Sequence, residues 1–204
     1  MGTVTDESKR QSEIVGQPPR IRPLQAGEMG AEARAIAARI RSAAGLPDSA
    51  EVSEYVATLL KHPLLYEKHA ALGTELLAHG TLTGRQRELA ILRTGWLCGA
   101  PYEWGEHVGI AKRNGVVAED IARVAEGSSA QGWNDEDKAI LQAAEELHAD
   151  AAISDATWQR LEAFLDERQL IELPYLIGNY TKVAFVQNAL RLRLNPGNQG
   201  LSAR

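Results

Sequence analysis

The chain has 204 residues, a length typical of one domain or of one domain with a tail. Hydrophobic residues make up 44% and charged residues 24%, as in an ordinary globular protein with a buried core. The formal net charge of −5 argues against a nucleic-acid partner, and the longest charge-free run, ten residues, excludes a membrane span, which needs about 20.

The N-terminal residues and the cysteine content both predict a cytoplasmic protein. Residues 1–20 are polar and lack the apolar segment of a secretory signal. The single cysteine, Cys98, cannot form an internal disulfide or supply a pair of thiols. Nothing in the sequence therefore calls for an oxidising compartment.

The composition along the chain predicts three segments. Residues 1–22 have few apolar side chains and a Pro-Pro pair, which indicates a flexible N-terminal leader, with extended packing against a neighbour as the alternative. Residues 23–195 are expected to form a single helical domain, and residues 196–204 a C-terminal tail. Within the domain the first predicted helices cover 31–44, 52–60 and 64–77, each with apolar residues at helical spacing.

Two helices with clear end signals follow. Thr83 and Gln86 form a capping-box pattern that opens a helix running to Cys98. Pro101 suits the first position of the next helix, which is expected to end at Asn114, with Gly115 in a left-handed conformation after it. The three-residue break between the two helices favours an antiparallel pair.

The rest of the chain is also predicted to be helical. Helices are expected over 116–124, from a cap at Asn134 to His148, from Ser154 or Asp155 to Leu165, and from Leu170 to about Leu194. The last one is apolar on several sides, which indicates a central helix or an oligomer interface, and carries Asn179 and Tyr180. Because no strand-like alternation of any length occurs, we predict an all-α fold.

One cluster of residues carries the chemical content. Glu103 and His107 are four apart, so they lie on one face of their helix. Glu88 on the preceding helix comes within reach of His107 if the two helices fold back on each other. Two carboxylates around one imidazole form a proton-transfer unit, in which a carboxylate fixes the orientation of the ring that gives or takes the proton. A purely structural Glu–His contact is the alternative.

Four nearby residues are candidates for substrate binding. Tyr102, Trp104 and Trp96 would line a pocket, or else belong to the core. Arg93, or Arg85, would bind a substrate carboxylate, with a surface role as the alternative. The Glu103–His107 spacing would also suit two metal ligands, but no third or fourth ligand is evident, so we predict neither a metal nor a cofactor.

These residues resemble the carboxymuconolactone decarboxylase and alkylhydroperoxidase D-like family. The peroxidase branch of that family carries Glu-x11-Cys-x2-Cys-x3-His, and here Glu88 and His107 keep the spacing. The segment Tyr102-Glu103-Trp104-x-x-His107 is characteristic of cysteine-free members, and the resemblance spans residues 60–192. It implies a helical bundle built of antiparallel helix pairs and a homo-oligomer, a dimer, trimer or hexamer.

The two cysteine positions of the motif hold other residues. Ala100 and Glu103 stand there, and Cys98 is out of register with both. Peroxide reduction on this scaffold needs an attacking and a resolving thiol, so the peroxidase activity of the family is disfavoured.

The resemblance implies a cofactor-independent lyase, similar to carboxymuconolactone decarboxylase, that acts on a small conjugated carboxylic acid or lactone. His107 would transfer the proton, and Glu88 would orient the imidazole ring of His107. Glu103 would be a second acid or base, and Tyr102 would donate a hydrogen bond to an enolate oxygen. Isomerisation, lactone opening and cyclisation use the same unit. Two alternatives remain, an antioxidant peroxidase that uses Cys98 between subunits and a non-catalytic oligomeric ligand-binding module.

Overall fold

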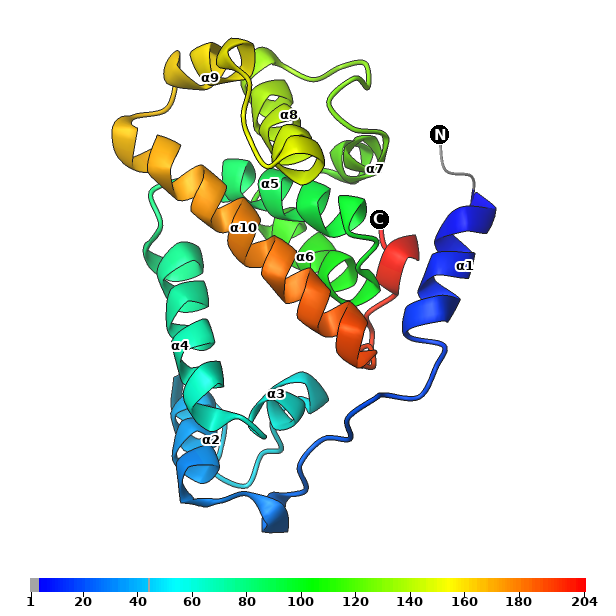
Figure 1. Cartoon of the computed structure of the whole chain (residues 1–204), viewed down its shortest axis with the longest axis vertical. Coiled ribbons are helices and arrows are strands. Elements are labelled where there is room, and N and C mark those ends of the chain that lie inside the picture. Colours follow the sequence, from blue (N-terminus) through cyan, green and yellow to red (C-terminus); the bar gives the residue numbers. More distant parts are fainter. Residues whose placement is uncertain (1–3, 44) are drawn as a thin grey trace.

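The computed structural model describes residues 4–43 and 45–204. Over these ranges the secondary structure is helical and contains no strand, so the all-α prediction is confirmed. The helices are α1 (Val4–Ile14), α2 (Ala31–Ala43), α3 (Glu54–Leu59), α4 (Pro63–Thr74), α5 (Gly84–Leu97), α6 (Pro101–Arg113), α7 (Ala118–Glu126), α8 (Asp135–Asp150), α9 (Asp155–Glu162) and α10 (Glu167–Leu190) (Figure 1). Short turns add η1 (Ala26–Glu28), the π-helical η2 (Glu75–His79) and η3 (Gly200–Ser202).

The helix ends lie close to the predicted ones because local capping groups fix most of them. The side chains of Thr83, Asn134 and Ser154 each accept a hydrogen bond from a backbone N–H in the first turn of α5, α8 and α9. The predicted end of the first helix at Ala44 lies outside the described residues, as do the first three residues of the predicted leader.

The last helix is shifted from its predicted range. It begins at Glu167 because Asp166 forms a capping box with Gln169, and it ends at Leu190 instead of Leu194. Arg191 takes a left-handed conformation with φ of 54°, which stops the helix four residues before the predicted end.

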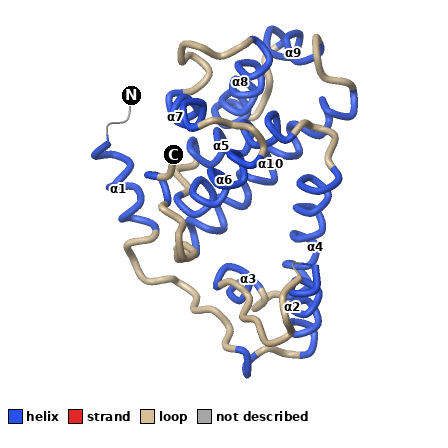
Figure 2. The backbone as a smooth tube through the Cα atoms, turned by 180° about the vertical axis from the view of Figure 1, so that it is seen from behind, coloured by secondary structure: helices blue, strands red, loops and turns tan. Residues whose placement is uncertain are grey.

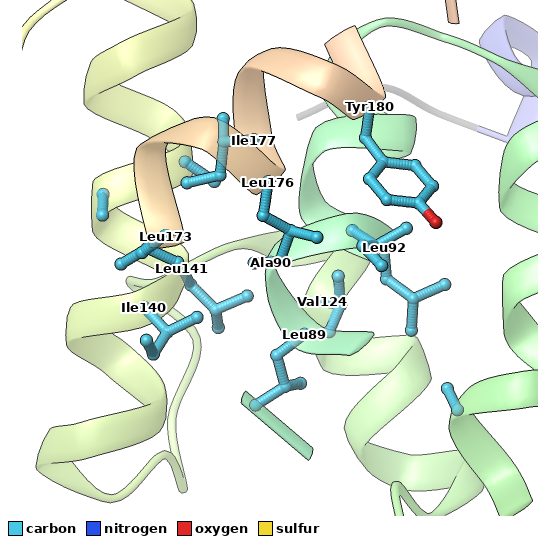
Figure 3. Packing of buried hydrophobic residues seen from close by; sticks show 14 of the residues in the cluster. Leu89, Ala90, Leu92, Val124, Ile140, Leu141, Leu173, Leu176, Ile177 and Tyr180 are labelled. Atoms are coloured by element: carbon cyan, nitrogen blue, oxygen red, sulfur yellow. The ribbon is translucent and has the colours of Figure 1, made fainter. Parts of the chain in front are cut away.

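The core lies among α5, α6, α8 and α10. Leu89, Ala90 and Leu92 of α5 face Ile140 and Leu141 of α8 and a row of α10 residues that includes Leu173, Leu176 and Ile177 (Figure 3). All three α5 side chains are fully buried, and α5 carries buried residues on every side from Glu88 to Gly95. α5 is thus the central helix, and its polar residue Glu88 is held inside the protein.

A second, smaller hydrophobic cluster joins α2, α3 and α4. It includes Ile36 and Ala37 of α2, Val56 of α3, Leu60 at the end of α3, and Tyr66 of α4. Figures 1 and 2 place α2, α3 and the start of α4 at the opposite end of the molecule from α7–α9. Helix α4 leads the chain from the smaller cluster toward the larger one (Figure 2).

The predicted leader and tail are more ordered than expected. Helix α1 occupies part of the segment 1–22, and it contacts η3 near the C-terminus. The side-chain oxygen of Gln11 accepts the backbone N–H of Leu201 at 2.7 Å, and Trp104 Nε1 donates to the carbonyl of Ala203 at 3.0 Å. Burial of Leu201 and Ala203 against α6 explains the order, because the apolar side chains of the tail gain a partner. None of the described helices is both long and apolar enough to cross a membrane.

Candidate active site

The antiparallel pairing of α5 and α6 brings the predicted residues together. Gly95 lies against the backbone of Trp104 at one end of the pair, and Arg87 Nη2 donates to Asn114 Oδ1 at the other. The connection between the helices is only three residues long, and Gly99 turns it with a φ of 51°. Glu88 therefore faces the middle of α6, where His107 lies.

His107 lies between two carboxylates. Its Nδ1 is 2.8 Å from Glu88 Oε2, and its Nε2 is 3.1 Å from Glu103 Oε1. All three side chains are buried, with Glu88 fully excluded from solvent. The three residues thus lie together, as the sequence predicted.

The two carboxylates keep the imidazole protonated. Burial by itself lowers the pKa of His107, but the hydrogen bonds with Glu103 and Glu88 and the charges of both carboxylates outweigh it and raise the pKa to about 9. Both ring nitrogens then carry protons, and each donates to one carboxylate. The guanidinium of Arg87 supplies a second cation, with Nε 3.0 Å from Glu88 Oε1.

Two residues of α10 hold the cluster from the other side. Gln187 Nε2 donates to Glu103 Oε2 at 2.6 Å, and the ring of Tyr180 meets the imidazole of His107 edge-on, with ring centroids 5.0 Å apart. Asn179 and Tyr180, which interrupt the apolar sequence of α10, are both on the same cavity wall. Gln187 had no sequence signal, because its partner is distant in the chain.

A cavity of about 230 Å³ opens beside this cluster. Glu103 and His107 line it, whereas Glu88 lies behind His107. The other lining residues come from α3, α4 with η2, α6 and α10: Tyr55, His69, Gly73, Leu77, Tyr102, Glu106, Asn179, Tyr180, Val183 and Gln187. The cavity mixes aromatic and aliphatic walls with a few polar groups, which is typical of a site for a small organic molecule.

Three predicted substrate contacts are not beside His107. Trp104 is fully buried and donates to Ala203, so it is a core residue. Trp96 packs against Trp104 and lies under the guanidinium of Arg204, outside the cavity. Arg93 Nη1 donates to the carbonyls of Val124 and Ala125 at the end of α7, which fixes the side chain there.

Arg85 is also fixed by partners away from the cavity. Its Nη2 lies 2.7 Å from both Asp120 Oδ2 and Asp137 Oδ2. Of the predicted substrate-binding residues, only Tyr102 lines the cavity. The helical spacing that predicted Trp96 and Trp104 as pocket residues serves core packing instead.

Tyr55 and His69 are cavity residues that sequence reasoning missed. Tyr55 Oη and His69 Nε2 are 2.8 Å apart, and the ring of Tyr55 stacks on that of Tyr102 at 5.6 Å. Both residues belong to the smaller helical cluster, so only long-range packing brings them to α6. No local pattern in the sequence would have indicated them.

Cys98 lies outside the cavity. It lines a different surface hollow, between α1 and the end of α5, with Arg10 and Trp96. Burial raises the pKa of its thiol to about 11. The thiol is therefore protonated at neutral pH and a weak nucleophile. Within residues 4–43 and 45–204, no group of three or more His, Cys, Asp or Glu side chains is arranged to hold a metal ion.

Comparison with known proteins gives one matching family model and several similar helical structures. A model of the carboxymuconolactone decarboxylase family matches residues 63–146. The structure is similar to that of the debrominase Bmp8 in complex with 2,3,4-tribromopyrrole, with a TM-score of 0.71, 16% identity, and coverage of 90% of this chain and 95% of the other. No curated protein matches the sequence.

Two further solved structures are peroxidase-related proteins. The one from Silicibacter sp. TM1040 has a TM-score of 0.72 and 13% identity, and the match covers 89% of this chain and 96% of the other. The alkylhydroperoxidase AhpD core from Ralstonia eutropha JMP134 has a TM-score of 0.69 and 17% identity, with coverage of 88% and 94%. The fold and the buried Glu–His–Glu cluster thus define an alkylhydroperoxidase D-like helical protein. Over residues 63–146 the chain matches the carboxymuconolactone decarboxylase family model, and its fold is that of alkylhydroperoxidase D-like proteins, without the Cys-x-x-Cys pair of the peroxidase branch.

Proposed function

We propose that the protein is a cofactor-independent lyase that decarboxylates a small conjugated carboxylic acid or lactone acid by proton transfer. One observation carries this proposal: the imidazole of His107 is held between Glu88 and Glu103 at the wall of a cavity of about 230 Å³. A cavity of this size suits a compound of about one ring.

The reaction needs a proton at carbon and a place for an electron pair. When the bond to the carboxylate carbon breaks, carbon dioxide leaves and its electron pair enters the conjugated carbonyl, which becomes an enolate. The enolate then takes a proton at carbon from the Glu103–His107 pair, which restores the carbonyl. The pair is suited to give this proton, because the raised pKa of about 9 keeps it loaded at neutral pH.

Each member of the cluster has its own part. Glu103 and His107 line the cavity and share the proton that is transferred. Glu88 fixes the ring of His107 through Nδ1 and compensates the positive charge that the ring carries. Arg87 in turn fixes Glu88, so Glu88 keeps its carboxylate oxygen on the imidazole.

The charges around the cavity support a decarboxylation. Among the described residues that line it there is no lysine or arginine, and two are glutamates, Glu103 and Glu106. An ion pair with the substrate carboxylate would stabilise the ground state more than the transition state, in which that charge moves away. The imidazolium of His107 is already paired with Glu88 and Glu103, so a substrate carboxylate would gain little ion-pair stabilisation from it.

The thiol-based alternative has less support. The cavity that holds His107 is lined by no cysteine among the described residues, and Cys98 lies elsewhere with a protonated thiol. A non-catalytic ligand-binding module would also use the cavity, but it would not require an imidazolium paired on both sides.

The predicted homo-oligomer stays a proposal. Its support is α10, where Ile171 and Tyr175, four residues apart, and Phe185 further along the helix are exposed. Light scattering of the purified chain measures the mass directly. A monomer at micromolar concentration would contradict the proposal.

A substrate screen with matched variants tests the proposed function. Small cyclic conjugated acids and lactone acids are incubated with the protein, and release of carbon dioxide is measured. For any compound turned over, His107→Gln and Glu103→Gln are expected to lower kcat by about 100- to 10,000-fold. His148→Gln, which changes an exposed histidine of α8, is the control. A folded His107→Gln variant with unchanged kcat would refute the role of His107.

A further inference from the structure

Two tyrosines bring hydroxyl groups to the cavity beside the Glu–His–Glu cluster. Tyr55 comes from α3 and Tyr102 from α6, and both line the cavity. Their rings are stacked, with centroids 5.6 Å apart and planes inclined by 29°. The two phenols therefore stand next to each other on one wall.

His69 leaves the hydroxyl proton of Tyr55 free. Burial and the nearby Lys182 ammonium lower the pKa of His69, so its ring is neutral at pH 7 and carries one N–H. Its Nε2 lies 2.8 Å from Tyr55 Oη, and its Nδ1 is buried without a hydrogen-bond partner in the described chain. An unpaired buried acceptor is tolerated better than an unpaired buried N–H. The proton is thus on Nε2, and the imidazole donates to Tyr55.

The hydroxyl of Tyr102 also accepts a hydrogen bond and keeps its own proton free. Asn195 Nδ2, from the segment that follows α10, donates to Tyr102 Oη at 2.8 Å. The hydroxyl oxygen is therefore engaged as an acceptor, while its proton has no acceptor among the described residues. Burial raises the pKa of both tyrosines, with a further contribution from the charge of Glu103, so both phenols stay protonated at neutral pH.

We propose that Tyr55 and Tyr102 form an oxyanion-binding pair that takes the carbonyl oxygen of the substrate as it becomes an enolate oxygen. His69 and Asn195 are positioning residues, which hold the two hydroxyl groups so that their protons point into the cavity. This inference rests on the proposed function, because it takes the reaction to form an enolate. The tyrosines would bind the enolate oxygen, while His107 and Glu103 would protonate the carbon. Two preorganised donors act most strongly where charge develops in a site shielded from water.

The pair also defines what the cavity recognises. A planar, delocalised oxyanion on a single ring can accept both phenol protons while its ring lies between the aromatic walls. A substrate without a carbonyl or phenol oxygen would leave two buried donors unpaired, at a cost in binding. The substrate class is thus a ring compound whose conjugated carbonyl oxygen is free to accept two hydrogen bonds.

Binding of 4-nitrophenolate tests the pair without any turnover. The change in its visible absorbance on titration with the protein gives a Kd, measured at a pH where the free phenol is ionised. Tyr55→Phe and Tyr102→Phe are each expected to raise Kd about 10-fold or more, since each removes one hydrogen bond to a charged oxygen. Tyr66→Phe is the matched control, because Tyr66 is buried beside His69 but does not line the cavity. No binding to the unmodified protein, or a Kd of folded Tyr55→Phe and Tyr102→Phe equal to that of the unmodified protein, would overturn the proposal.

Substitutions of His69 separate positioning from mere packing. His69→Gln keeps an N–H that can donate to Tyr55, whereas His69→Leu does not. We expect His69→Leu to raise the Kd of 4-nitrophenolate several-fold and His69→Gln to restore most of the affinity. Equal Kd values for the two variants would overturn the role of His69. Binding of 4-nitrophenolate needs no turnover, so failure of the tyrosine pair appears in Kd, whereas failure of the proton-transfer function appears only in kcat.

Discussion

The imidazole of His107 and the carboxylate of Glu88 are joined by a hydrogen bond of 2.8 Å across nineteen residues of sequence. The bond links the two helices of an antiparallel pair at their centre, and neither partner is in contact with bulk water. A buried carboxylate of this kind is costly unless it is paired, so the contact couples the stability of the pair to the protonation of the ring. The properties of the site follow from this coupling.

Substitution of Glu88 changes the acidity of His107. In Glu88→Gln one of the two negative partners is gone, so the pKa of His107 falls below its value of about 9. Because the protonated form is the active acid, we expect the alkaline limb of the kcat profile to move to lower pH. Glu106→Gln is the control, since Glu106 lines the same cavity but accepts from Asn198. An unshifted profile in Glu88→Gln would contradict the coupling.

The stability of the protein depends on pH through the same group. The pKa of His107 is raised from 6.5 to about 9 in the folded state, so the folded protein binds this proton more tightly. The stabilisation is complete below pH 6.5 and is lost as the pH rises through about 9. We expect the free energy of unfolding of the unmodified protein, relative to His107→Gln, to fall by on the order of 3 kcal/mol over this range.

Urea unfolding at a series of pH values measures this difference. The exposed His148 provides the control, because His148→Gln should follow the unmodified protein at every pH. A difference between the unmodified protein and His107→Gln that does not change from pH 6.5 to pH 9 would show that the imidazole is not held as a cation.

We expect Arg93 to stabilise the fold instead of binding substrate. Its Nη1 donates to two carbonyls at the end of α7, and its Nε lies 2.9 Å from Glu145 Oε1. We expect Arg93→Met to lower the free energy of unfolding by about 2 kcal/mol and to leave KM unchanged. Arg113→Met, at an exposed position of α6, should have little effect on either quantity. A raised KM in Arg93→Met at unchanged stability would instead support the substrate-binding role that was predicted from the sequence.

Removal of the single thiol should have no effect on catalysis. Cys98→Ser is expected to keep the full kcat for the lyase reaction, because Cys98 is outside the cavity and its thiol is protonated. Consumption of hydrogen peroxide by both proteins, in the presence of a dithiol reductant, is the accompanying measurement. Peroxide turnover that is lost in Cys98→Ser would favour the peroxidase alternative.

The sequence predicted the Glu–His–Glu cluster because its geometry is local. Glu103 and His107 are one helical turn apart, and Glu88 is in the adjacent helix of a tight pair, so spacing and a short connection suffice to place them. The family resemblance added that the spacing between Glu88 and His107 is that of the family motif. The tryptophans Trp96 and Trp104 are on the same helices, but periodicity alone does not distinguish a pocket wall from the core.

The rest of the cavity depends on contacts between distant segments. Tyr55, His69 and Gln187 reach it from α3, α4 and α10, and Asn195, from the chain after α10, donates to the cavity residue Tyr102. Their positions follow from how the two hydrophobic clusters pack, which no single stretch of sequence encodes. The C-terminal tail escaped prediction for the same reason, because Ala203 finds its partner, Trp104, only in the folded protein.

Histidine NMR titration is the most direct test of whether the ring of His107 is held as a cation. The ring nitrogens of His107, assigned by comparison with His107→Gln, report their protonation without any substrate. We expect both ring nitrogens of His107 to be protonated at pH 7 and the ring to lose its proton near pH 9. A His107 ring that is neutral at pH 7, with a pKa at or below 6.5, would contradict this expectation.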